Sequence, residues 1–239
     1  MGLTGIWRWL WLIPLAGVIV GLLYWLLVLS EGTYLGKSTV AWLYDRYAKR
    51  YDRVKRVRAY YEQRFVGLPL AEWLAGRAPW RVLDVAAGTG RVATALAASI
   101  DEPGVLVAVD HAVGMLEQTP RRGADSLLAV CYAQQDAEHL GIASESVDAV
   151  TCLEALEFMP HGKTAVREFL RVLKPGGMLL VSNRIGHDCW YFLGRLCKRG
   201  RLEAYLQELG MEQVRRQDWQ VFYDLVWAFK PNPNRLETQ

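Results

Sequence analysis

The first pattern along the 239-residue chain is a long apolar stretch, because no charged residue occurs from Trp9 to Leu29. A helix of about 21 residues rises roughly 32 Å, enough to cross a hydrocarbon core of about 30 Å. Tyr24 and Trp25 near its end, and tryptophans near its start, are typical of membrane interfaces. We predict one transmembrane helix here. A signal peptide is the rival interpretation, although its apolar region would be only about 7 to 15 residues long, and a buried or membrane-surface helix is another.

The second pattern is amphipathic, since apolar residues recur every three or four positions from Ser38 to Phe65 with basic residues between them. This spacing predicts one or two helices. From Glu31 to Gly67 there are nine Lys or Arg against four acids, so this segment carries +5 of a chain whose net charge is only +3. Basic residues follow the apolar stretch and only Arg8 precedes it, which predicts a cytoplasmic body and an outside N-terminus. Such residues favour an anionic bilayer surface; a solvated helix that covers the core is the alternative.

The third pattern alternates strands and helices after a short helix predicted at Ala71 to Ala75. Near-continuous apolar strands separated by helices indicate a parallel sheet that is covered on both faces. The chain ends differently, because two strands after Gly210 are joined by a very short connection that forces an antiparallel pair. The predicted strands are Arg81–Val85, Val105–Val109, Leu127–Tyr132, Val147–Cys152, Met178–Ser182, Met211–Trp219 and Val221–Phe229.

Composition removes several classes of function. Cys131, Cys152, Cys189 and Cys197 have no C-x-x-C spacing, and two of them lie in strands predicted to be buried, so we expect free thiols. No set of His, Cys and carboxylate residues has metal-ligand spacing, so we expect no metal. The basic residues are not concentrated on the predicted α/β body, which argues against a nucleic-acid partner.

A turn between strand and helix, Val82 to Gly90, carries the first chemical signal. Small residues and glycines let the backbone approach a ligand, and the helix that begins near Arg91 points its first N–H groups at that ligand. We therefore predict a nucleotide-like cofactor. The loose G-x-G-x-x-G/A spacing from Gly88 to Ala93, with Asp110 twenty residues beyond Gly90, keeps a dinucleotide-dependent dehydrogenase as an alternative.

Acidic residues follow four successive predicted strands, at the edge where open α/β sheets bind ligands. Asp84 ends the first strand, and Asp110 ends the second, where a carboxylate can accept both hydroxyls of a ribose. Asp136 follows the third and can read an adenine edge together with a neighbouring N–H, and Glu154 with Glu157 follows the fourth. Each acid alone is more typical of a helix cap or a solvated loop, but their joint placement indicates one site.

These stretches resemble the motifs of the class I S-adenosylmethionine-dependent methyltransferases, from about Tyr44 to Lys230. The matching segments are Leu83–Gly90, Val109–Leu116, Gln135–Ala137, Val147–Val150 and Leu170–Gly177. Ala48 to Asp52 also resembles the entry segment of ubiquinone and menaquinone C-methyltransferases and of bacterial phosphatidylethanolamine N-methyltransferases. The resemblance implies an α/β, Rossmann-like sheet of seven mostly parallel strands with an antiparallel last strand, preceded here by one transmembrane helix.

The resemblance also implies a site for S-adenosylmethionine, with the Gly88–Gly90 loop behind the methionine end, Asp110 at the ribose, and Asp136 with the Ala137 amide at the adenine. Ala86 stands where the family usually has glycine, and Glu157 where many relatives have histidine, so the identity of a general base stays open. The expected cofactor-binding residues are Asp84, Ala86, Ala87, Gly88, Thr89, Gly90, Asp110, His111, Met115, Asp136, Ala137 and Leu153; the expected catalytic residues are Glu154 and Glu157.

We therefore expect a transmembrane anchor at 1–31, basic juxtamembrane helices at 32–70, a methyltransferase domain at 71–230 and a loose tail at 231–239. The expected function is methyl transfer to a lipid-like or other amphiphilic small-molecule acceptor at the cell membrane. Tyr44, Tyr47 and Tyr51 have the spacing either of simple packing or of a pocket for a cationic head group. His161, His187 and Asp188 are weaker candidates. An interaction subunit of a membrane complex that keeps the fold is the second hypothesis.

Overall fold

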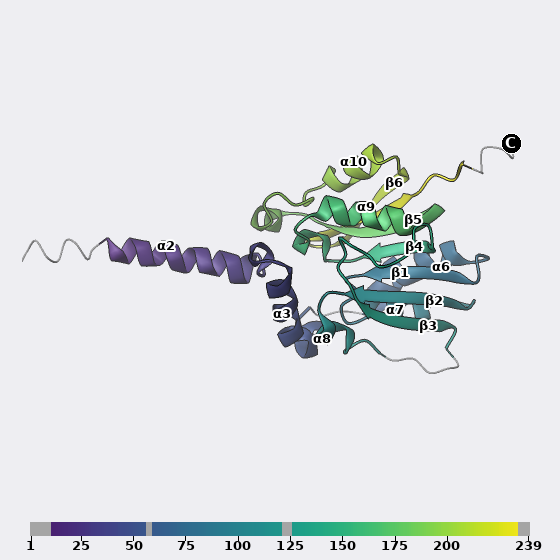
Figure 1. Cartoon of the computed structure of the whole chain (residues 1–239), viewed down its shortest axis with the longest axis horizontal. Coiled ribbons are helices and arrows are strands. Elements are labelled where there is room, and N and C mark those ends of the chain that lie inside the picture. The colour runs from purple at the N-terminus through teal and green to yellow at the C-terminus, as the bar shows by residue number, and fades with distance from the viewer. Residues whose placement is uncertain (1–10, 56–58, 121–125, 234–239) are drawn as a thin grey trace, which may run out of the picture.

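The computed structural model describes residues 11–55, 59–120 and 126–233. The predictions that concern Arg8, Trp9 and residues 234–239 lie outside these ranges. Within them, a mixed sheet carries helices on both faces, and one apolar helix extends away from this body (Figure 1).

The sheet has seven strands in the order β3-β2-β1-β4-β5-β7-β6. Strands β1 to β5 are mutually parallel, and β7 lies between β5 and β6 and is antiparallel to both. The predicted fold, with a reversed last strand, is confirmed. The bounds are β1 Trp80–Val85, β2 Gly104–Asp110, β3 Leu128–Gln134, β4 Val147–Cys152, β5 Leu173–Arg184, β6 Glu212–Gln220 and β7 Tyr223–Phe229.

Two apolar layers hold the helices to the sheet. One face packs against α9 (Gly162–Val172) and α10 (Arg201–Glu208), whose buried side chains include Phe169 and Leu206. The other face packs against α6 (Leu68–Leu74) and α7 (Arg91–Ala97), through side chains such as Leu70 and Leu96. The strands are therefore buried from both sides, and the ligand-binding edge of the sheet is left to loops and short helices. These are α8 (Val113–Leu116), η5 (Leu156–Phe158) and η6 (His187–Tyr191).

Strands β3 and β6 are the exceptions to burial because they form the two edges of the sheet. In β3 every side chain after Leu128 is partly buried or exposed. Cys131 is therefore exposed, contrary to the prediction of a buried strand, whereas Cys152 on the central strand β4 is buried as expected. All four cysteines are free thiols.

The apolar helix comprises α2 (Leu12–Tyr24) and a π-helical turn, η1 (Trp25–Leu29). All residues of α2 are exposed, and the helix stands clear of the body (Figure 1). Its length and composition fit a membrane span, and they also fit a signal sequence. It joins the body through Ser30 and the 3₁₀ turn η2 (Thr33–Leu35).

The amphipathic segment forms two described helical runs. The first contains α3 (Lys37–Tyr47), η3 (Ala48–Arg50) and α4 (Tyr51–Lys55); the second contains α5 (Ala59–Glu62), η4 (Gln63–Gly67) and α6. The short helix predicted at Ala71 to Ala75 is present as α6, but it begins earlier, at Leu68, because helical backbone continues from η4 through Gly67. A Cβ atom at Gly67 would lie 2.4 Å from the carbonyl oxygen of Ala95. This glycine therefore permits close packing of η4 on α7 rather than ending a helix.

Candidate active site

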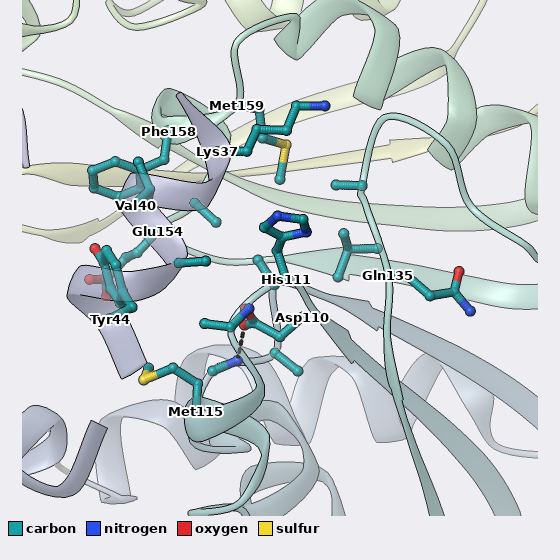
Figure 2. A pocket seen from close by; sticks show the side chains of 18 of the residues that line it. Lys37, Val40, Tyr44, Asp110, His111, Met115, Gln135, Glu154, Phe158 and Met159 are labelled. Atoms are coloured by element: carbon teal, nitrogen blue, oxygen red, sulfur yellow. Dashed lines mark hydrogen bonds between the residues drawn. The ribbon is translucent and has the colours of Figure 1, made fainter. Parts of the chain in front are cut away.

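A pocket lies at the carboxyl ends of β1, β2 and β4 and encloses about 880 Å³, including its open mouth. Figure 2 places Asp110, His111 and Met115 on one side of it, and Tyr44 with Phe158 on another. Ten of the twelve expected cofactor-binding residues line this one pocket: Ala86, Ala87, Gly88, Thr89, Asp110, His111, Met115, Asp136, Ala137 and Leu153. Asp84 and Gly90 are not among its lining residues.

The turn from β1 to α7 is built on left-handed backbone. Ala86, Gly88 and Gly90 have φ of 53°, 58° and 81°. A Cβ atom at Gly90 would lie 2.1 Å from Cγ2 of Thr119, so only glycine fits there. Ala86 adopts the same region with a Cβ atom, at a backbone cost of about 1 to 2 kcal/mol. The substitution of the family's usual glycine by Ala86 is therefore accommodated as strain within the turn.

Asp110 is held by the turn that it faces. Its Oδ2 accepts a hydrogen bond from the Gly88 N–H at 2.8 Å, drawn as a dashed line in Figure 2, and its Oδ1 accepts one from the Ala112 N–H at 2.9 Å. Burial raises the pKa of Asp110 above its ordinary value, although these N–H groups oppose that shift. A carboxylate offers about four acceptor positions, so its fixed oxygens retain capacity for vicinal hydroxyls.

Lys37, which the sequence did not single out, reaches the predicted adenine end of the pocket. Its Nζ lies 2.7 Å from Asp136 Oδ2 and 2.6 Å from the buried Glu138 carboxylate. Burial favours a higher pKa for Asp136, but the hydrogen bond from Lys37 outweighs it and the pKa falls below its usual value. Asp136 is thus an ionised carboxylate with one oxygen already bound to α3. A ligand at this end meets Asp136 and Lys37 together.

Glu154 lines the pocket as a paired carboxylate. Its side chain accepts hydrogen bonds from Arg91 at 2.9 Å, Gln220 at 2.9 Å and Lys55 at 3.4 Å. Burial would raise the pKa of Glu154, but the charges of Arg91 and Lys55 outweigh it and lower the pKa below its ordinary range. An efficient general base has a pKa near the working pH. The geometry therefore favours a fixed negative charge over a proton acceptor at Glu154.

Glu157 lies outside the lining of the pocket, although it follows the same strand. It accepts hydrogen bonds from Tyr223 Oη and, at 3.2 Å, from Arg184. Among the described residues its Oε2 has no hydrogen-bond partner. Burial raises the pKa of Glu157, against the opposing charge of Arg184. The structure separates the two expected catalytic acids, with Glu154 at the pocket and Glu157 in a buried polar cluster beside it.

Asp84 supports the site from within the sheet. Its Oδ1 accepts a hydrogen bond from Thr151 Oγ1 at 2.6 Å, and its Oδ2 has no partner among the described residues. Burial raises the pKa of Asp84 to about 7, against the lowering effect of the Thr151 hydroxyl. Asp84 therefore joins β1 to Thr151 of β4 within the sheet, at the start of the β1–α7 turn.

One wall of the pocket comes from α3, which the sequence analysis placed outside the methyltransferase domain. Its pocket-facing residues are Lys37, Val40, Ala41 and Tyr44, followed by Tyr51 from α4. Tyr44 packs edge-on against Phe158 at 5.7 Å between ring centroids and donates a hydrogen bond to Glu31 at 2.9 Å. Tyr44 and Tyr51 thus both pack and line the pocket, whereas Tyr47 does not line it.

The weaker candidates lie elsewhere. The His161 N–H donates a hydrogen bond to Glu138, and Asp188 pairs with Arg184 at 3.2 Å. None of His161, His187 and Asp188 lines the pocket. Among the described residues, no group of three or more His, Cys, Asp or Glu is arranged to hold a metal ion.

Comparison with known proteins finds similarity to methyltransferases over part of the chain. Residues 83–181 match the family described as methyltransferase domain. The chain is 37% identical over 139 residues to the ubiquinone/menaquinone biosynthesis C-methyltransferase of Syntrophotalea carbinolica, covering 58% of each chain. It is 34% identical over 143 residues to the demethylmenaquinone methyltransferase of Beutenbergia cavernae, covering 60% of this chain and 57% of that one. The matches thus span less than two thirds of these relatives.

Solved structures agree at the level of fold. A SAM-dependent methyltransferase from Aquifex aeolicus superposes with a TM-score of 0.60 and 17% identity, over 77% of this chain and 97% of that one. Residues 83–181 therefore resemble a methyltransferase domain, and the sheet has the fold of this solved methyltransferase. The pocket suits S-adenosylmethionine, because it combines the left-handed β1–α7 turn, the Asp110 carboxylate and an apolar side at Met115 and Leu153.

Proposed function

We propose that the protein is an S-adenosylmethionine-dependent methyltransferase that acts on a lipid-like or other amphiphilic acceptor at a membrane. The observation that carries the proposal is the single pocket that gathers the β1–α7 turn, Asp110 and Asp136 at the carboxyl ends of adjacent strands. A quinone-like acceptor is supported by the names of the relatives. A dehydrogenase is disfavoured because the matched family and the reversed β7 belong to methyltransferases.

The bound cofactor would supply a methyl group on a sulfonium, which passes to the acceptor's nucleophilic atom as the C–S bond breaks and sulfur keeps the electron pair. This reaction depends mainly on alignment, and proximity supplies much of the acceleration. The residues of this chain would orient and enclose the reactants: Asp110 and Asp136 at the nucleoside, and α3 as the covering wall. Glu154, with its lowered pKa, would balance positive charge at the acceptor, and the proton that a carbon or amine acceptor loses would pass to water at the open mouth of the pocket.

The acceptor side of the pocket is apolar and aromatic, which suits an amphiphilic molecule. Val40, Tyr44, Tyr51, Phe158 and Met159 contribute to it. The three aromatic rings offer flat surfaces to a ring or an alkyl group, and tyrosine faces also attract a cationic head group.

Membrane attachment is supported by α2 and by the outer face of α3. Trp42 on α3 is 57% exposed, and the Arg46 guanidinium lies 5.5 Å from the centre of its ring. An aromatic and basic face beside an apolar helix suits a bilayer surface. With α2 as a single span and the positive flank inside, the catalytic domain would lie in the cytoplasm.

Two measurements test the proposal on detergent-solubilised protein. Calorimetry should detect binding of S-adenosylhomocysteine to the protein. Micromolar binding of NAD without binding of S-adenosylhomocysteine would refute the proposed cofactor. Methyl transfer from labelled cofactor into a lipid extract of the source cell should label the lipid fraction. Label found only in protein or water-soluble products would refute the proposed acceptor.

A second candidate function is an interaction subunit of a membrane complex. It is supported by Gly17 and Gly21, four residues apart on the exposed helix α2, where added Cβ atoms would meet nothing within 4 Å. Small residues at this spacing let two transmembrane helices approach closely. Cofactor binding within such a complex would mean that both roles coexist.

A further inference from the structure

Four large apolar side chains are exposed in two segments that follow β5 and β6. Trp190 and Leu193 are 77% and 60% exposed, and Val221 and Phe222 in the β6–β7 connection are 82% and 46% exposed. The Ile185 N–H donates a hydrogen bond to the Phe222 carbonyl at 2.8 Å, so the two segments adjoin. We call these four residues the apolar rim.

The apolar rim is joined to the base of α2 by direct contacts. Tyr34, just after the apolar helix, donates hydrogen bonds to the carbonyls of Tyr191 at 3.2 Å and Leu193 at 3.1 Å. Its ring stacks on Trp25 of the last turn with centroids 5.0 Å apart. The Arg195 guanidinium lies 5.5 Å from the centre of the same ring. The segment of the rim that carries Leu193 is therefore fixed at the level where the apolar helix ends.

The position of the rim agrees with these contacts. In Figure 1 the arrowheads of the parallel strands point toward the side from which α2 extends. Strand β5 ends at Arg184 and leads into η6, so the rim lies at the same edge of the sheet as the pocket. An edge that carries both an apolar helix and further exposed apolar side chains is suited to lipid rather than to water.

Basic residues follow the rim in sequence. Lys198 and Arg201 are exposed. Arg199 is committed to ion pairs with Asp224 at 2.7 Å and Asp218 at 3.0 Å. Tryptophan and leucine beside exposed Lys and Arg is the composition of segments that lie in the interfacial layer of an anionic bilayer.

We propose that the apolar rim inserts into the interfacial layer of the bilayer that α2 enters, which gives the body a second membrane contact. This proposal rests on the proposed anchoring by α2. A single helix followed by a short connection leaves the body free to tilt, whereas a second contact fixes its orientation. The carboxyl edge of the sheet, with the pocket, then faces the lipid.

The test uses the full chain in nanodiscs of phosphatidylcholine and phosphatidylglycerol. Cys131→Ser and Cys189→Ala remove the two thiols that are not buried, and an environment-sensitive fluorophore is attached to one new cysteine at a time. Trp190→Cys probes the rim and Val18→Cys probes the apolar helix. Leu127→Cys is the matched control, since Leu127 is 47% exposed but lies at the amino end of β3.

The fluorophore at position 190 should emit at shorter wavelength than the one at position 127, and doxyl-labelled lipid should quench it while aqueous iodide does not. If position 18 is quenched by lipid but position 190 behaves like position 127, the rim proposal fails and the anchoring stands. If position 18 is quenched by iodide, both fail. Protection of position 190 from both quenchers would show that the rim is covered by protein instead of lipid and would overturn the rim proposal.

Discussion

Two aspartates on adjacent strands show how position on the sheet sets the behaviour of a carboxyl group. Asp110 at the end of β2 borders the pocket and accepts two backbone N–H bonds. Asp84, one strand away and fully enclosed, has one hydroxyl partner and a pKa raised by burial to about 7. Asp110 is therefore suited to bind a ligand, whereas Asp84 is suited to join β1 to β4.

Replacing Asp110 with Ala should weaken the binding of S-adenosylhomocysteine about ten- to a hundredfold. The physical reason is the loss of a charge-assisted hydrogen bond of roughly 1.5 to 3 kcal/mol. Calorimetry measures the change, and Asp110→Asn, which keeps the shape of the side chain, separates loss of charge from disruption of the turn. The exposed Glu117→Gln serves as the control. Unchanged affinity in both Asp110 variants would remove Asp110 from the cofactor site.

Replacing Asp84 with Asn should change the pH dependence of stability. The folded pKa of about 7 exceeds the unfolded value of about 3.9, so the native state holds this proton more tightly. That stabilisation is complete below about pH 4 and is lost as the pH rises to about 7. The Asn variant has no such proton, so its unfolding free energy relative to the wild type should rise over this interval. Denaturant titrations from pH 4 to 8 measure it, and parallel curves would contradict the raised pKa.

At the scale of elements, helix α3 connects the apolar helix to the pocket wall. Lys37 at its first turn bonds to Asp136 and to the buried Glu138, and Tyr44 packs on Phe158. The inner face of α3 therefore covers the pocket, while Trp42 on its outer face is exposed.

Lys37→Met should lower thermal stability and weaken cofactor binding several-fold, because it leaves the buried Glu138 carboxylate without its cation and frees the start of α3. Lys49→Met is the matched control, since Lys49 is exposed in η3 and does not line the pocket. Thermal melts with and without S-adenosylhomocysteine report both effects. Equal behaviour of the two variants would show that α3 does not hold the pocket closed.

The strands and the β1–α7 turn were predictable from sequence because their signals are local: apolar runs, glycines at left-handed positions and acids at strand ends. The role of α3 in the pocket wall was not predictable, since Lys37 and Asp136 are 99 residues apart in sequence. The apolar repeat of a helix does not show which surface of the protein the helix packs against. Glu154 and Glu157 looked equivalent in sequence, and their different partners separate them. Cys131 was misplaced because an apolar run does not reveal which strand is the edge.

At the scale of the molecule, the apolar helix, the pocket and the apolar rim lie at one edge of the sheet. The strand direction produces this arrangement, because parallel strands present all their carboxyl ends together. A membrane on that side would meet the acceptor wall of the pocket, and the opposite edge would remain in water.

Gly17→Leu combined with Gly21→Leu tests whether α2 also binds another helix. Leucine at both positions should release any partner subunit, because close approach of two helices requires small side chains. Cofactor affinity should stay unchanged, since α2 does not line the pocket. Size-exclusion chromatography of the solubilised wild type and double variant compares which proteins co-elute with each. Co-elution of the same partner with the double variant would exclude this face of α2 as the contact.

The place of β7 has a consequence for the order of folding during synthesis. Strand β7 follows the six other strands of this sheet along the described chain, yet it lies inside the sheet and pairs with β5 and β6. Until residues 223–229 are available, β5 keeps an open edge of unpaired backbone groups, which is prone to wrong pairing. Since chains emerge from the N-terminus onward, an apolar helix that enters the bilayer early would hold the unfinished sheet at the membrane surface throughout this interval.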